Sequence, residues 1–128
     1  MGTSNPSEGP SPSLRAEVKD VVLVAAGAIP GALVRWQLDN TLIANLIGCL
    51  LIGVINAHRP PRPRLMLLAG IGFCGSITTF SSWILELFAT IESSGLLAGL
   101  HQLGAGLGGG LAAVALGMGL GLGLGLRR

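Results

Sequence analysis

The chain has 128 residues, of which half are hydrophobic and only 11% carry a charge, and its formal net charge is +2. A soluble domain of this size has about 25% charged residues, so the composition excludes an ordinary soluble domain and predicts an integral membrane protein. The small net charge does not indicate nucleic acid as a partner, because the basic residues flank apolar segments, where membrane topology explains them.

The first half of the chain predicts a tail followed by two membrane helices. Residues 1–19 are rich in Pro, Ser and Gly and lack apolar periodicity, which predicts a disordered N-terminal tail. Residues 20–128 are predicted to form one four-helix transmembrane domain. The first helix is expected over Asp20 to Leu38, which covers roughly 28 Å and is enough to span the hydrocarbon. The second is expected over Thr41 to Ala57, before a short basic loop rich in proline.

The third helix is expected from Arg64 to Thr90, with a break around Gly75. The stretch GFCGSITTFSSW, residues 72–83, places glycines and five hydroxyls inside an otherwise apolar segment. Lipid hydrocarbon cannot hydrogen-bond a free peptide group, so such a break persists only where it faces protein, water or an ion.

After a turn over residues 92–95, the fourth helix is expected over Leu96 to Leu126. Gly117, Gly121 and Gly125 repeat every four residues there, which predicts a small-residue face for close helix packing.

The basic residues predict one orientation in the cell membrane. Four spans would place both termini and the middle loop on the same side. That side carries seven of the eight basic residues, while only Arg35 lies toward the opposite side. The positive-inside rule then predicts that both termini are cytoplasmic. The seven are Arg15, Lys19, Arg59, Arg62, Arg64, Arg127 and Arg128.

Polar and aromatic residues within the spans allow two interpretations each. Asn45 either bridges two helices or lines an ion path, and Arg35 either reaches the interface or faces a vestibule. Glu86 has the same choice between a structural and a functional role. Phe80 and Trp83 are either packing residues or the edge of an anion path, since ring edges carry partial positive charge. Freed carbonyls at the break could coordinate a small cation, whereas freed N–H groups favour anions.

Three segments, GALVRW, ANLIGCLLIG and GFCGSITTFSSW, together resemble the Fluc (CrcB) family of fluoride-specific ion channels. The resemblance covers roughly residues 27–90 in the order expected. It implies four-helix subunits that assemble as antiparallel dimers, with two narrow fluoride pores along the subunit interface. It also implies a structural sodium ion at the dimer centre, which is held by carbonyls of the broken third helix and is not transported.

Carried over by position, the resemblance assigns a role to each candidate residue. The carbonyls of Gly75 and Thr78 would bind sodium. The pore would be lined by Asn45, Phe80, Trp83, Thr79 and Ser82, with Asn45 donating to fluoride. Arg35 would lie near a vestibule, and Glu86 falls where the family tends to carry an acid.

Three departures from the family pattern concern the pore. Trp83 stands where the family has Phe, and Ser76 replaces a common glycine. The family usually places Tyr and Ser hydroxyls in the fourth helix, but residues 95–128 contain no Ser, Thr or Tyr. The uneven basic residues also disfavour one sequence inserting in both orientations. We therefore expect a heterodimer with a paralogue of opposite charge bias, with a homodimer as the alternative.

Two further functions compete with a channel subunit. One is a non-conducting subunit that contributes only glycine faces and half of the sodium site. The other is a small multidrug exporter, which would need a membrane-embedded carboxylate in the first helix, and none lies between Val21 and Leu38. An enzyme is not expected, because no nucleophile–base pair or metal-ligand cluster stands out in the sequence.

Overall fold

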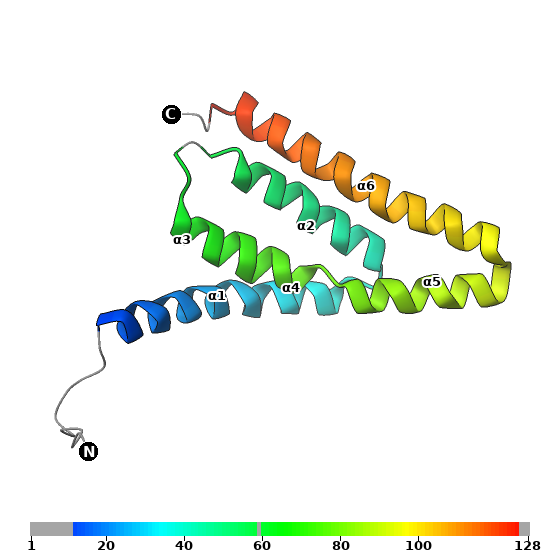
Figure 1. Ribbon diagram of the computed structural model, residues 1–128, viewed down its shortest axis with the longest axis horizontal. Helices are drawn as coiled ribbons and strands as arrows, with labels where there is room; N and C mark the ends of the chain where they lie inside the picture. Colours follow the sequence, from blue (N-terminus) through cyan, green and yellow to red (C-terminus); the bar gives the residue numbers. More distant parts are fainter. Residues whose placement is uncertain (1–11, 59, 126–128) are drawn as a thin grey trace, which may run out of the picture.

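The computed structural model describes residues 12–58 and 60–125, and within them every regular element is a helix, as predicted (Figure 1). Two of the segments between α2 and α5 have three residues each, and η1 is a π-helix. In chain order the elements are α1 (Pro12–Gln37), α2 (Thr41–Asn56), α3 (Pro63–Leu65), η1 (Met66–Cys74), α4 (Gly75–Ile77), α5 (Phe80–Ser94) and α6 (Leu96–Gly123).

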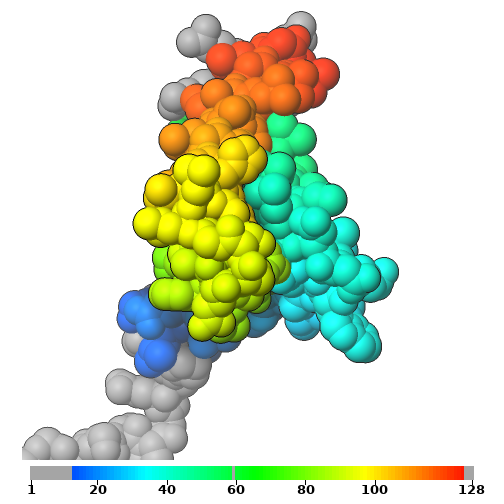
Figure 2. Space-filling model, turned by 90° about the vertical axis from the view of Figure 1, so that its right-hand side faces the viewer, coloured from blue at the N-terminus to red at the C-terminus, as the bar shows by residue number. Residues whose placement is uncertain are grey.

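Glycines allow the helices to pack at backbone distance. A Cβ added at Gly117 would lie 2.1 Å from the carbonyl oxygen of Leu50, so α6 lies directly against α2. On α1, a Cβ at Gly27 would lie 1.8 Å from the carbonyl oxygen of Leu68 in η1. Figure 2 shows α6, in yellow to red, along α2 in turquoise. The small-residue face predicted from the glycine spacing is therefore confirmed at Gly117 and Gly121, both of which contact α2.

The apolar side chains point mostly outward. Only five hydrophobic side chains are buried among the described residues. Of these, Ile77 is the only large one that is fully buried. Two stretches, Pro63–Ser94 and Leu96–Gly123, are long and apolar enough to cross a membrane, and α2 is a shorter apolar helix. A surface of this kind is expected to face lipid or another subunit rather than water.

The helix ends differ from the sequence prediction at three places. α1 begins at Pro12, so residues 12–19 are helical rather than part of a tail; the helix formers that follow Leu14 favour this extension. The rest of the predicted tail, residues 1–11, lies outside the described residues. α5 continues to Ser94, and Gly95 alone makes the turn, because its φ of +90° is readily available to glycine. α6 ends at Gly123, three residues earlier than expected.

The break in the third span lies later than predicted. Gly75 is helical, with φ −64° and ψ −31°, whereas the extended residues are Thr78 (ψ 148°) and Thr79 (ψ 123°). Extended backbone suits β-branched residues, and the Thr79 side chain caps α5 by accepting a hydrogen bond from the Ser82 N–H. Sequence analysis did not predict the π-helix before the break. Such segments are uncommon and often accompany functional sites.

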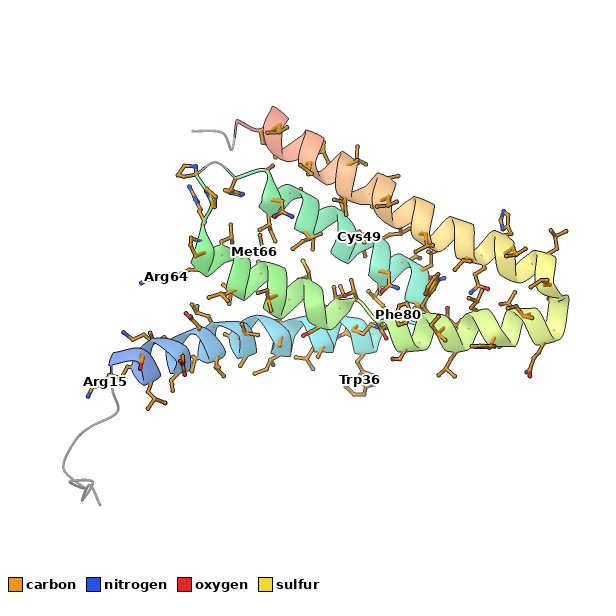
Figure 3. The ribbon with its side chains drawn as sticks, viewed as in Figure 1. Arg15, Trp36, Cys49, Arg64, Met66 and Phe80 are labelled. Atoms are coloured by element: carbon orange, nitrogen blue, oxygen red, sulfur yellow. The ribbon has the colours of Figure 1, made fainter. Side chains whose placement is uncertain are left out.

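The membrane orientation stays a prediction. Figure 3 shows Arg15 and Arg64 at one end of the molecule, as the four-span arrangement requires. Three of the seven basic residues used for that prediction, Arg59, Arg127 and Arg128, lie outside the described residues.

Candidate functional site

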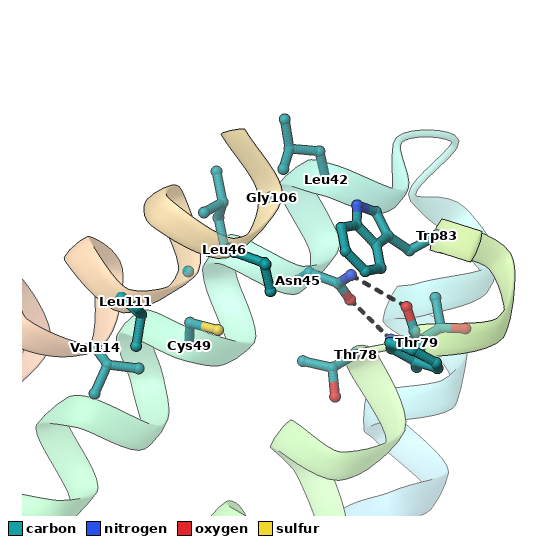
Figure 4. A pocket seen from close by; sticks show the side chains of 13 residues that line it. Leu42, Asn45, Leu46, Cys49, Thr78, Thr79, Trp83, Gly106, Leu111 and Val114 are labelled. Atoms are coloured by element: carbon teal, nitrogen blue, oxygen red, sulfur yellow. Dashed lines mark hydrogen bonds between the residues drawn. The ribbon is translucent and has the colours of Figure 1, made fainter. Parts of the chain in front are cut away.

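The side chain of Asn45 binds the backbone of the helix break at two points. Its Nδ2 donates to the Thr79 carbonyl oxygen at 3.1 Å, and its Oδ1 accepts from the Thr79 N–H at 2.8 Å (Figure 4). Asn45 therefore bridges α2 and the break, and its place in an ion path stays a prediction. The amide group has two hydrogens on Nδ2, and the second has no partner among the described residues.

The two hydrogen bonds between Asn45 and Thr79 form an amide clamp. The clamp and the α5 cap together leave two backbone carbonyls without their helical N–H partners. In a continuous helix the Gly75 carbonyl would accept from the Thr79 N–H, and the Thr78 carbonyl from the Ser82 N–H. The Thr79 N–H instead donates to Asn45, and the Ser82 N–H donates to the Thr79 hydroxyl at 3.4 Å. These are the two carbonyls that the sequence resemblance assigned to sodium. No atom lies within 4 Å of a Cβ added at Gly75, so this side of the helix is open.

The hydroxyls near the break fall into two groups. Thr78 donates back to the Cys74 carbonyl oxygen at 2.9 Å, so its hydroxyl proton is used within the helix. Thr79 donates to the Ser82 hydroxyl at 3.3 Å and lies 3.4 Å from the Ser81 hydroxyl. Thr79 and Ser82 therefore form one continuous polar strip at the start of α5.

A cavity of about 440 Å³ lies between α2, the break, α5 and α6 (Figure 4). Asn45, Thr79, Phe80 and Trp83 line it together, whereas Gly75 and Ser82 do not. The ring centroids of Phe80 and Trp83 are 5.8 Å apart, and the angle between the two ring planes is 49°. Their environments differ: Phe80 is 73% exposed, whereas Trp83 is 7% exposed. The full lining is Leu42, Asn45, Leu46, Cys49, Thr78, Thr79, Phe80, Trp83, Gly106, Leu107, Gly110, Leu111 and Val114.

Arg35 and Glu86 belong to a separate cluster that Thr41 joins. Arg35 donates from Nη1 to the Leu38 carbonyl oxygen and from Nη2 to the Thr41 hydroxyl, both at 3.1 Å. The Thr41 hydroxyl in turn donates to Glu86 Oε1. Thr41 is 2% exposed and ties the end of α1 to α5. Sequence analysis did not select Thr41, although its place directly after the N-cap Asn40 was a usable signal.

We expect Thr41→Val to destabilise the protein by about 1–3 kcal/mol, because the substitution leaves Arg35 Nη2 and the Glu86 carboxylate without their shared partner. Thr41→Ser keeps the hydroxyl and serves as the matched control. The measurement is the thermal midpoint of the purified protein in detergent. Equal midpoints for the two variants would contradict a role for the hydroxyl.

The fold and the site together define an all-helical protein with apolar outer faces and a polar helix break held by an amide clamp. Both features are typical of membrane proteins that handle ions. Residues 22–118 match the family model described as CrcB-like protein, Camphor Resistance (CrcB). The chain belongs to the CrcB family, which confirms the resemblance stated above.

Curated relatives carry the names of ion channels rather than enzymes. The chain is 50% identical over 103 residues to "Fluoride-specific ion channel FluC 2" of Parasynechococcus marenigrum (strain WH8102), covering 77% of each protein. It is 43% identical over 81 residues to "Fluoride-specific ion channel FluC 1" of Prochlorococcus marinus (strain NATL2A), covering 63% of the chain and 66% of that protein. It is 37% identical over 105 residues to "Fluoride-specific ion channel FluC" of Haemophilus ducreyi (strain 35000HP / ATCC 700724), covering 72% and 83%.

Proposed function

We propose that the chain is a subunit of a fluoride-selective channel that exports fluoride from the cytoplasm across the cell membrane and lowers its toxicity. The observation that carries this proposal is the similarity to relatives named fluoride-specific channels over a region that includes the whole clamped break. The absence of an acid between Val21 and Leu38 disfavours a proton-coupled multidrug exporter.

The residues at the break suit a small, strongly hydrated anion. A selective pore must replace the water around fluoride with fixed donors, yet it must not bind the ion too tightly for exit. The free Nδ2 hydrogen of Asn45 and the hydroxyl of Ser82, whose oxygen accepts from the Thr79 hydroxyl, supply such donors. Phe80 adds a ring edge with partial positive charge. Its 73% exposure supports a position at a subunit interface rather than in a core. Arg35, at the end of α1, would face a vestibule.

A structural sodium ion fits the carbonyls at the break. Gly75 and Thr78 have both lost the N–H partners that a helix would give them, and carbonyl oxygen is a suitable ligand for a monovalent cation. Gly75 is also open to a second subunit. We propose that these two carbonyls and their counterparts in an antiparallel partner hold the ion. When bound, it supplies a fixed positive charge at the dimer centre.

We propose that the partner is a paralogue with opposite charge bias. One orientation of this chain is strongly favoured by its basic residues, so a homodimer with opposed subunits is disfavoured. The numbering of the relatives as FluC 1 and FluC 2 is consistent with paired genes. Hydroxyls on the partner's fourth helix would complete the donors that this chain lacks there.

The test compares fluoride efflux from liposomes that contain this chain alone with efflux from liposomes that contain the co-expressed pair. We expect efflux from the pair to exceed that of the single chain at least tenfold. Equal efflux would overturn the heterodimer but leave the channel intact. No fluoride efflux from either preparation, with both proteins folded, would overturn the channel.

A non-conducting subunit is the second candidate function. The presence of Trp83 where the family has Phe and the lack of hydroxyls in α6 favour it, because both depart from the family's pore residues. Phe80→Ile within the pair separates the two candidates. A channel-lining role predicts a large loss of efflux, whereas a scaffold predicts unchanged efflux.

A further inference from the structure

The indole of Trp83 packs flat against a glycine of α6. A Cβ added at Gly106 would lie 2.8 Å from the indole nitrogen and 2.9 Å from two of its ring carbons. No real Cβ is found so close, so any larger residue at position 106 would displace the ring. Trp83 and Gly106 therefore form a matched pair in which the absence of a side chain on α6 makes room for the indole on α5.

The side chain of Trp83 lines the cavity described above. Its indole N–H has no hydrogen-bond partner among the described residues, and every fully buried polar side-chain atom in that part of the chain has one. The indole nitrogen is thus not fully buried, although the residue as a whole is only 7% exposed. Trp83 and Gly106 both line the cavity, so this unpaired and partly accessible N–H belongs to a residue of the cavity wall (Figure 4).

The α6 wall of this cavity offers no side-chain donor of its own. Its lining residues are Gly106, Leu107, Gly110, Leu111 and Val114. The opposite walls contribute Asn45, whose Nδ2 donates one hydrogen to the Thr79 carbonyl oxygen and keeps the other, and Thr79, whose hydroxyl donates to Ser82. Two donors of this cavity lie against α6: the Trp83 N–H against Gly106, and the weaker Cys49 thiol, whose sulfur is 3.5 Å from a Cβ added at Gly110.

We propose that the indole N–H of Trp83 is an anion donor of this cavity and takes the place of a hydroxyl on α6. The proposal rests on the proposed fluoride function and extends it to one atom. An indole N–H is a donor without acceptor capacity, so it can hydrogen-bond fluoride but cannot compete with it for other donors. The pair Trp83–Gly106 thus supplies from α5 what the residues of α6 lack.

The direct test follows the indole proton by NMR in the co-expressed pair, labelled with ¹⁵N on this chain. Trp36, which is 82% exposed and points away from the bundle in Figure 3, is the internal control. Sodium fluoride is expected to move the Trp83 indole proton downfield and leave that of Trp36 unchanged, and sodium chloride is expected to move neither. If the chemical shift of the Trp83 indole proton does not change with fluoride, in a pair that conducts fluoride, the proposal is overturned.

Substitutions test the same atom through transport. Trp83→Phe is expected to lower fluoride efflux of the pair at least tenfold, while the matched Trp36→Phe has no effect. Adding Gly106→Ser to Trp83→Phe is expected to restore much of the efflux, because the smaller ring leaves room for a hydroxyl on α6.

The outcomes separate this proposal from the function on which it rests. Wild-type efflux from Trp83→Phe would overturn the indole donor and leave the channel standing. Absence of both fluoride efflux and any fluoride-dependent indole shift in the wild-type pair would overturn the proposed function itself. If Trp83→Phe does not fold, the NMR titration of the unsubstituted pair still decides the question.

Discussion

Replacing Asn45 with aspartate is expected to reduce fluoride efflux at least a hundredfold. Asp keeps the oxygen that accepts from the Thr79 N–H, but it loses the Nδ2 donor to the Thr79 carbonyl and to a passing anion. A carboxylate about 4 Å from fluoride at an effective dielectric constant of about 20 costs about 4 kcal/mol. The measurement is fluoride efflux from liposomes containing the co-expressed pair.

Asn56→Asp is the matched control, because it makes the same chemical change on the same helix at an exposed position that does not line the cavity around the break. Its efflux is expected to equal that of the wild type. If Asn45→Asp conducts fluoride as well as Asn56→Asp does, Asn45 is only a structural clamp.

The second large effect concerns the contact between α2 and α6. Gly117→Ala places a methyl group 2.1 Å from the Leu50 carbonyl oxygen, so the helices must separate. Overpacking of this kind costs about 1–3 kcal/mol, and contact with rigid backbone places this case at the upper end. We expect a lower thermal midpoint and loss of the monodisperse species in detergent by size-exclusion chromatography.

Gly119→Ala is its control on the same helix, because no atom lies within 4 Å of a Cβ added there. Alanine is a better helix former than glycine by about 0.8–1 kcal/mol, so this variant is expected to be as stable as the wild type or more so. A Gly117→Ala variant as stable as Gly119→Ala would contradict the backbone contact.

The sequence alone located the broken span but not the residues at which it opens. Glycines suggested Gly75, yet the extended residues are Thr78 and Thr79. The difference arises because a glycine permits a break without requiring it. The requirement comes from Asn45, which is 34 residues away in the chain and takes the Thr79 N–H out of the helix. A contact of that sequence separation has no periodic signal.

The same reason explains two contacts that the sequence did not predict, those of Thr41 and of Gly106. Thr41 looks like any threonine at a helix start, and its importance comes from Arg35 and Glu86, which reach it from different helices. Gly106 is one of many glycines in its helix. It differs from Gly104 and Gly108, which have open space beside them, only because the Trp83 indole lies on it.

Composition and hydrophobic patterning by themselves determined the helical class, the order of the long helices and the set of polar residues around the break. These properties depend on local propensity and on the cost of free peptide groups in lipid, both of which can be read along the chain. Tertiary structure alone decided which N–H groups leave the helix, which carbonyls they release and where the indole of Trp83 points. Those outcomes depend on side chains from separate helices meeting in space.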